Sequence, residues 1–204
     1  MSRIGRNCRM IGAWSLAAAS LGLGVGCGGG DSDTVDSGSG NPESSVTLDE
    51  AQAPVEKAAP ELVSIRDDAN EILDEGTEGF DARLAELEMA GIPVVVNKWA
   101  SWCGPCRDEF PDFQAQAIER EDEVAFIGVL SNDGADTGET FLSELPLPYP
   151  TYLDSDQDIA FDRDIQRAFP TTLFIDSEGE VAFTKYGPYE SEDQLAADID
   201  KYAN

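Results

Sequence analysis

The sequence contains no histidine and few basic residues: 13 Lys and Arg stand against 41 Asp and Glu, a formal net charge of -28 at pH 7. The missing imidazole excludes Ser-His-Asp and Cys-His catalysis and histidine-ligated zinc or haem. The shortage of basic residues argues against nucleic acid or an anionic membrane surface as a direct partner, because both are bound through basic patches. The 204 residues suffice for one domain with extensions or two small ones, and a hydrophobic share of 41% suffices for a packed core.

The N-terminal residues have the composition of a targeting segment. Residues 1–26 contain three arginines and no acidic residue, and residues 10–26 are apolar or small. This run is short and glycine-rich for a transmembrane helix, which needs roughly 20 apolar residues. A basic start, an apolar middle and a small-residue end are typical of a secretory signal peptide, which we assign to residues 1–26.

The signal peptide ends in Gly24-Val25-Gly26-Cys27, which resembles the lipobox of bacterial lipoproteins, although Gly24 stands where leucine is usual. The resemblance implies a lipid on Cys27; the alternative is ordinary cleavage near Gly26, which leaves an odd cysteine. Residues 28 to about 47 are rich in Gly, Ser and Asp and cannot bury enough apolar surface to fold. We therefore predict a lipidated N-terminus and flexible linker over residues 27–59. The protein is expected outside the cytoplasm, anchored to the bacterial cell membrane.

The remaining residues, 60–204, have the pattern of one folded domain. Apolar residues at helical spacing predict two helices within residues 60–91: Leu62, Ile65, Ala69 and Ile72 in the first, and Leu84, Leu87 and Ala90 in the second. Buried strands are predicted at 92–96 and 124–130, a hairpin at 172–175 and 181–183, and helices from 105, at 140–145, at 157–169 and at 191–202. Strands that alternate with helices and end in a hairpin indicate an α/β sandwich around a mixed sheet, preceded by a helical extension.

The most informative stretch is WASWCGPCR, residues 99–107, which follows a predicted strand and opens a predicted helix. The sulfur of Cys103 is expected at the helix N-terminus, where unpaired N–H groups favour a thiolate. Cys106 lies one turn further along the same face, within disulfide reach. Gly104 permits the turn, and Pro105 is tolerated because the first helical turn has no N–H bond to lose. We predict that Cys103 attacks and Cys106 resolves the mixed disulfide.

A zinc site and a structural disulfide are the two alternatives to redox chemistry for the cysteine pair. Zinc requires four ligands, but beyond the signal peptide the chain offers only this pair, Cys27 and no histidine. A four-residue disulfide loop closes little chain entropy, so as a staple it would contribute little. The pattern favours redox function.

The segment VVVNKWASWCGPCRDEFP resembles the thioredoxin fold, and specifically the extracytoplasmic TlpA/ResA branch of thiol–disulfide oxidoreductases. The resemblance covers roughly residues 92–204. It implies a cis-proline beside the dithiol, which here is Pro170, and a substrate chain that pairs with the backbone around Phe169. Trp102 would flank the same surface, although from composition alone a tryptophan is more often core.

Two further positions distinguish the branches of this family. Cytoplasmic thioredoxins carry a buried aspartate six positions before the first cysteine, where this sequence has Asn97. TlpA/ResA-like proteins carry a glutamate under the dithiol that handles its protons, and Glu109 matches it, three residues after Cys106. The alternative for Glu109 is a solvated helix carboxylate. Lys98 departs from the aromatic residue usual in that strand, and residues 60–91 lack an obvious counterpart in the family core.

The leading hypothesis is a monomeric, lipid-anchored thiol–disulfide oxidoreductase that reduces protein disulfides and takes electrons from a membrane thiol relay, with no cofactor or metal. A peroxiredoxin-like peroxidase shares the general fold but needs a Pro-x-x-x-Thr-x-x-Cys motif, which is absent from the sequence. A non-catalytic binding module that uses the cis-proline groove is the third hypothesis, and retention of both cysteines argues against it.

Overall fold

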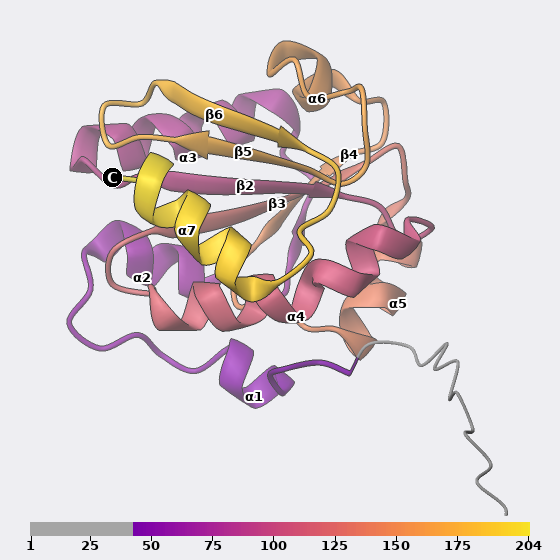
Figure 1. Cartoon of the computed structure of the whole chain (residues 1–204), viewed down its shortest axis with the longest axis horizontal. Coiled ribbons are helices and arrows are strands. Elements are labelled where there is room, and N and C mark those ends of the chain that lie inside the picture. Colours follow the sequence, from indigo (N-terminus) through magenta and orange to yellow (C-terminus); the bar gives the residue numbers. More distant parts are fainter. Residues whose placement is uncertain (1–42) are drawn as a thin grey trace, which may run out of the picture. The chain divides into compact units, whose positions relative to one another are not determined.

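A six-stranded mixed β-sheet is the centre of the domain that the structure, a computed structural model, describes over residues 43–204. The strands lie in the order β1-β4-β3-β2-β5-β6, with helices on both sides of the sheet (Figure 1). β1, β4, β3 and β2 are mutually parallel, β5 is antiparallel to β2, and β6 is antiparallel to β5. The strands are β1 Ile72–Leu73, β2 Val94–Trp99, β3 Ala125–Ser131, β4 Thr151–Asp154, β5 Thr171–Ile175 and β6 Val181–Tyr186. The predicted α/β sandwich is confirmed.

β2 and β3 occupy the middle of the sheet, and every residue of both strands is buried. Their runs of apolar residues have this form because helices cover both faces of a central parallel strand. Val94, the first residue of β2, pairs with Ala125 of β3 on one side and with Ile175 of β5 on the other. The chain leaves β2 at Trp99, so residues 100–103 lie at the carboxyl edge of the parallel strands, where open α/β sheets bind their ligands.

Seven helices fall within the described residues: α1 Leu48–Ala51, α2 Pro60–Asp67, α3 Gly76–Ala90, α4 Gly104–Glu119, α5 Ala135–Glu144, α6 Asp158–Asp162 and α7 Glu192–Tyr202. α4 packs against α7, and α3 packs against α6 (Figure 1). Trp99 of β2 contacts aromatic side chains of α4 and α5, whereas Tyr152 of β4 contacts Phe80 of α3. In the sheet register these two residues point to opposite faces. α4 and α5 therefore cover one face of the sheet and α3 the other.

Three aromatic rings hold α4 and α5 to the end of β2. The ring centroids of Trp99 and Phe110 are 5.2 Å apart, those of Trp99 and Phe141 5.1 Å, and those of Phe110 and Phe141 4.9 Å. All three side chains are at most 2% exposed. Contacts of this kind each contribute about 1 kcal/mol beyond the area they bury. The cluster fixes the start of α4 relative to the strand that precedes it.

Residues 43–59 contact the domain, although the linker was expected to extend to residue 59. α1 begins with a capping box between Thr47 and Glu50, and Ala51 and Val55 are buried. Ser45 donates from its backbone N–H to Oε1 of Gln114 on α4 over 2.8 Å. The folded part thus begins earlier than the predicted boundary at residue 60. The signal peptide and Cys27 lie outside the described residues, and none of the helices within residues 43–204 is long and apolar enough to cross a membrane.

Four secondary-structure assignments differ from the sequence-based ones. Ile72, assigned to a helix, lies in β1, a two-residue strand too short to leave a pattern. β4 was missed because it has four residues and follows a proline-rich stretch at 146–150. The helix predicted at 157–169 is only α6, because Asp164 adopts a left-handed φ of 61° that ends helical continuation. α5 begins at Ala135, five residues before the predicted start.

Candidate active site

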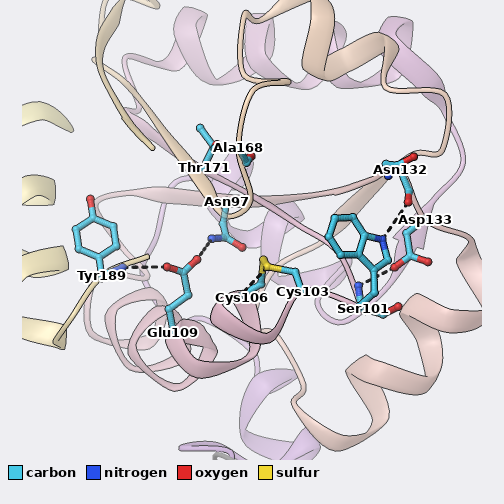
Figure 2. The surroundings of a disulfide bond; sticks show 11 residues. Asn97, Ser101, Cys103, Cys106, Glu109, Asn132, Asp133, Ala168, Thr171 and Tyr189 are labelled. Carbon is cyan, nitrogen blue, oxygen red and sulfur yellow. Dashed lines mark hydrogen bonds between the residues drawn. A yellow bond between two sulfur atoms is a disulfide. The ribbon is translucent and has the colours of Figure 1, made fainter. Parts of the chain in front are cut away.

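Cys103 and Cys106 are joined by a disulfide at the start of α4, with an S–S distance of 2.00 Å and a Cα–Cα distance of 5.3 Å (Figure 2). The predicted pairing is therefore present. Cys103 is 4% exposed, whereas Cys106 is fully buried. Cys103 is therefore the residue of the pair that reaches the surface, whereas Cys106 is enclosed.

The helix N-terminus gives Cys103 a polar partner. Cys103 is the N-cap residue of α4, and its Sγ accepts a hydrogen bond from the backbone N–H of Cys106 over 3.1 Å. The free N–H groups of a first helical turn and the positive end of the helix dipole favour a negative charge at this position. Gly104 and Pro105 are both exposed beside the sulfurs. The surface next to Cys103 is therefore open to another chain.

The peptide bond between Phe169 and Pro170 is cis, as the family resemblance implied. It directly precedes β5, the antiparallel neighbour of β2. The carbonyl of Pro170 accepts from the N–H of Gly187 over 3.0 Å, and Oγ1 of Thr171 donates to the carbonyl of Ala168 over 2.8 Å. The cis-proline loop is thus held on both sides of the cis bond.

Trp102 lies on the surface beside the dithiol, 56% exposed. Its ring meets that of Phe169 edge-on, with centroids 4.9 Å apart. The structure therefore brings together Trp102, Cys103 and the cis-proline loop, as the resemblance implied, and the core alternative for Trp102 is wrong.

A loop after β3 fixes the residues in front of Cys103, and the sequence analysis missed it. Nε1 of Trp102 donates to the carbonyl of Asn132 over 3.2 Å. The N–H of Ser101 donates to Oδ2 of Asp133 over 2.6 Å. The pKa of Asp133 is lowered. Burial alone would raise it, but the hydrogen bonds from Ser101, Thr137 and Gly134 together outweigh burial. The sequence Ser-Asn-Asp-Gly directly after a buried strand could have indicated this loop, because it lies at the same edge of the sheet as the dithiol.

Glu109 is buried beneath the dithiol, 1% exposed, so its interpretation as a solvated carboxylate is wrong. Its Oε1 accepts from Nδ2 of Asn97 over 2.9 Å, and its Oε2 accepts from the N–H of Tyr189 over 3.2 Å (Figure 2). Burial raises the pKa of Glu109 from 4.5 to about 8, against the opposing effect of these two hydrogen bonds. In the disulfide form the carboxyl group therefore carries a proton at pH 7.

Lys98, which the sequence left unexplained, is fully buried. Its side chain lies on the face of the sheet opposite Asn97, and its Nζ is 3.6 Å from the centroid of the Phe169 ring.

Within residues 43–204, no group of three or more Cys, Asp and Glu side chains is arranged to hold a metal ion.

The sheet order, the dithiol at a helix N-terminus and the adjacent cis-proline define a redox protein with a thioredoxin-like fold. The model of the AhpC/TSA family matches residues 65–184. The chain belongs to this family, within its ResA- and DsbE-type thiol–disulfide oxidoreductases.

Curated relatives support this assignment. Thiol-disulfide oxidoreductase ResA of Bacillus subtilis is 29% identical over 131 residues, which are 61% of this chain and 68% of ResA. Thiol:disulfide interchange protein HelX of Rhodobacter capsulatus is 35% identical over 124 residues, 60% of this chain and 68% of HelX. Sporulation thiol-disulfide oxidoreductase A of Bacillus subtilis is 30% identical over 106 residues, 50% of this chain and 64% of the relative. Across such relatives the chain spans from about half to two thirds of their length.

Solved structures share the fold. A putative thiol:disulfide interchange protein DsbE from Chlorobium tepidum superimposes with a TM-score of 0.54 at 23% identity, covering 58% of this chain and 83% of that one. The dsbF protein of MTB, described in mixed oxidized and reduced forms, gives a TM-score of 0.51 at 26% identity, covering 54% and 81%. The thioredoxin-like fold expected from the sequence is confirmed.

Proposed function

We propose that this protein reduces disulfides in other proteins outside the cytoplasm, as a monomer held to the bacterial cell membrane by a lipid on Cys27. The observation that carries the proposal is the pair at the start of α4: Cys103 at the helix N-terminus beside cis-Pro170, and Cys106 fully buried behind it. This arrangement supports two sequential thiol–disulfide exchanges.

In the reduced protein the thiolate of Cys103 attacks one sulfur of a substrate disulfide. The bond between Cys103 and the substrate forms as the substrate S–S bond breaks, and one substrate thiolate leaves. Cys106 then attacks the Sγ of Cys103, which re-forms the intramolecular disulfide and releases the second substrate thiolate. Two electrons pass from the dithiol to the substrate, whose two sulfurs each take up a proton.

In this proposal Glu109 accepts the proton that Cys106 loses. It lies three residues after Cys106 on α4, the spacing that puts two side chains on one helical face. Cys106 must lose its proton to attack, and the buried carboxylate is a local acceptor. In the disulfide form burial raises the pKa of Glu109 to about 8, so the carboxyl group can keep this proton at pH 7. When the disulfide is reduced again, the same group returns the proton.

The substrate chain is assigned to the surface that Trp102 and the cis-proline loop form together beside Cys103. The exposed Gly104 and Pro105 let a chain approach Cys103 without a steric barrier. The backbone around Phe169 would pair with the docked chain, as in the family that the sequence resembles. The two aromatic rings supply apolar contact area beside the attacking sulfur.

The membrane anchor and the direction of electron flow complete the proposal. Sixteen residues separate Cys27 from Ser44, which within the described residues is the first with a side-chain contact to the domain, and this length spans at most roughly 55 Å when extended. Such a tether keeps the dithiol near a membrane thiol relay, the proposed electron donor. The CGPC sequence is that of reducing thioredoxins, which supports reduction as the physiological direction.

Reduction of insulin by the full-length protein, with dithiothreitol as electron source, tests the proposal. Wild type is expected to accelerate precipitation of the insulin B chain, and Cys103→Ser and Cys106→Ser are expected to remove the acceleration. Peroxide consumption without insulin reduction would favour a peroxidase instead. Equal rates with wild type and Cys103→Ser would indicate a binding module and contradict the proposed function.

A further inference from the structure

A lysine on the strand that leads to the dithiol is buried without a hydrogen-bond partner. Lys98 is 0% exposed, and its Nζ has no donor–acceptor contact within the described residues. Burying an ammonium group without hydrogen bonds is costly, so its position requires a compensating interaction or a function. Because Lys98 and Asn97 are neighbours in β2, their side chains lie on opposite faces of the sheet. Lys98 therefore lies away from the Glu109 carboxyl group.

The ring of Phe169 provides the compensating contact. Nζ of Lys98 is 3.6 Å from the ring centroid, well inside the 6 Å at which a cation is attracted by an aromatic face. The carboxylate of Asp154 does not form a hydrogen bond with Lys98. It accepts hydrogen bonds from Oγ of Ser131 and from the N–H groups of Ile159 and Ala160 instead. Burial lowers the pKa of Lys98 to about 8, with Asp154 opposing the shift, so the ammonium form predominates at pH 7.

Phe169 connects this buried cation to the surface of the site. It forms the cis peptide bond with Pro170, and its ring meets that of Trp102 edge-on at 4.9 Å. Trp102 in turn directly precedes Cys103. Lys98 thus contacts Phe169, and Phe169 contacts Trp102. These contacts run from the buried strand β2 to the exposed surface beside Cys103.

We propose that Lys98 is a positioning residue for protein substrates: its ammonium group holds the Phe169 ring and so fixes the edge of the cis-proline loop on which a substrate chain docks. The inference rests on the proposed function and deepens it, because it concerns recognition of the substrate chain rather than chemistry at sulfur. A protein disulfide needs this loop in place. A small disulfide, which has no chain to dock, needs only the sulfur of Cys103.

The test compares Lys98→Met with Lys201→Met at pH 7 in the full-length protein. Methionine keeps an apolar chain of similar length and removes the charge. Lys201→Met is the matched control, because Lys201 is an exposed residue of α7 whose Nζ lies 4.6 Å from the ring centroid of Tyr202. We expect Lys98→Met to lower kcat/KM for insulin about fivefold to tenfold, mainly through KM, the range that loss of a buried cation–π contact supports. Reduction of bis(2-hydroxyethyl) disulfide, a small disulfide without a peptide backbone, should stay within about twofold, as should both activities of Lys201→Met.

A second variant keeps the inference testable if Lys98→Met does not fold. Lys98→Gln removes the charge and keeps a flexible side chain with a polar end, and it should show the same split between insulin and bis(2-hydroxyethyl) disulfide. In a Phe169→Leu background, which lacks the ring, Lys98→Met should cause no further loss of insulin reduction, because the two residues act through one contact.

Each other outcome contradicts the inference. Wild-type rates in Lys98→Met would show that the cation does not position the loop. Equal loss for insulin and bis(2-hydroxyethyl) disulfide would show that Lys98 acts on the dithiol itself. Both results leave the proposed function standing. A wild-type protein that reduces neither substrate would instead overturn the proposed function and this inference with it.

Discussion

Nδ2 of Asn97 donates to Oε1 of Glu109 over 2.9 Å, and this hydrogen bond links the strand before the dithiol to the helix that carries it. The strand position that holds a buried aspartate in cytoplasmic thioredoxins is here a neutral amide, and the buried acid comes from α4 instead. Because Asn97 cannot ionise, a single titratable acid lies at this contact. Its protonation should therefore be measurable by replacing one residue.

The first prediction concerns the stability of the oxidised protein against pH. The pKa of Glu109 is about 8 in the folded protein and about 4.5 when exposed, so the folded state holds the proton more tightly. Its contribution is fully present below pH 4.5 and is lost as the pH rises toward 8, by at most about 5 kcal/mol. Chemical denaturation of wild type and Glu109→Gln across pH 5 to 9 measures the difference.

The two stability curves should cross. At pH 5 the Gln variant should be less stable by about 1 kcal/mol, because its single amide oxygen can accept only one of the hydrogen bonds donated by Asn97 and by the N–H of Tyr189. At pH 9 it should be the more stable protein, since wild type must then ionise a buried carboxyl group or unfold. A constant difference between the curves from pH 5 to 9 would show that Glu109 does not titrate in this range.

The second prediction concerns the reactivity of Cys103 in the reduced protein. An ionised Glu109 disfavours a thiolate close to it, because two negative charges repel each other. Glu109→Gln should therefore move the midpoint of Cys103 alkylation to lower pH and slow exchange with protein disulfides. The measurement is the alkylation rate of Cys103 against pH in both proteins. Superimposable curves would remove Glu109 from the proton transfer.

Much of the site could be predicted because its signals are local. Cys103, Gly104, Pro105 and Cys106 are contiguous, and the strand-to-helix pattern around them places them at a helix start. Pro170 was identified only through the family resemblance, since nothing in its neighbouring residues signals a cis bond.

What sequence reasoning missed depends on contacts between distant segments. The hydrogen bonds from Trp102 to Asn132 and from Ser101 to Asp133 each join residues about thirty positions apart. The contact between Lys98 and Phe169 requires β2 and β5 to be neighbours, which depends on the sheet order. One sequence does not reveal such pairings.

The third prediction concerns attachment to the membrane. Lipid on Cys27 is expected to bring the full-length protein into the membrane fraction, and Cys27→Ala should release it. Retained activity of Cys27→Ala on insulin would show that the released protein is folded. Membrane fractionation of both proteins measures the effect, and a Cys27→Ala protein that stays with the membrane would exclude anchoring through this residue.

The fourth prediction concerns the reduction potential of the dithiol. The CGPC motif is expected to give a value at the reducing end, near about -270 mV, far from the value of about -120 mV for the strong oxidant DsbA. Redox titration of the Cys103–Cys106 pair against glutathione measures it. A value close to that of DsbA would contradict the assignment as a reductase.

The most direct test of the central claim is capture of substrates on Cys103. In a full-length Cys106→Ala protein, expressed in its own membrane, the mixed disulfide cannot be resolved and should accumulate. Mass spectrometry of the proteins released by dithiothreitol should then identify cysteine-containing proteins from outside the cytoplasm. The Cys103→Ala/Cys106→Ala control should capture none of them. If the two proteins give the same set of adducts, or neither gives any, Cys103 is not the attacking sulfur and the account is wrong.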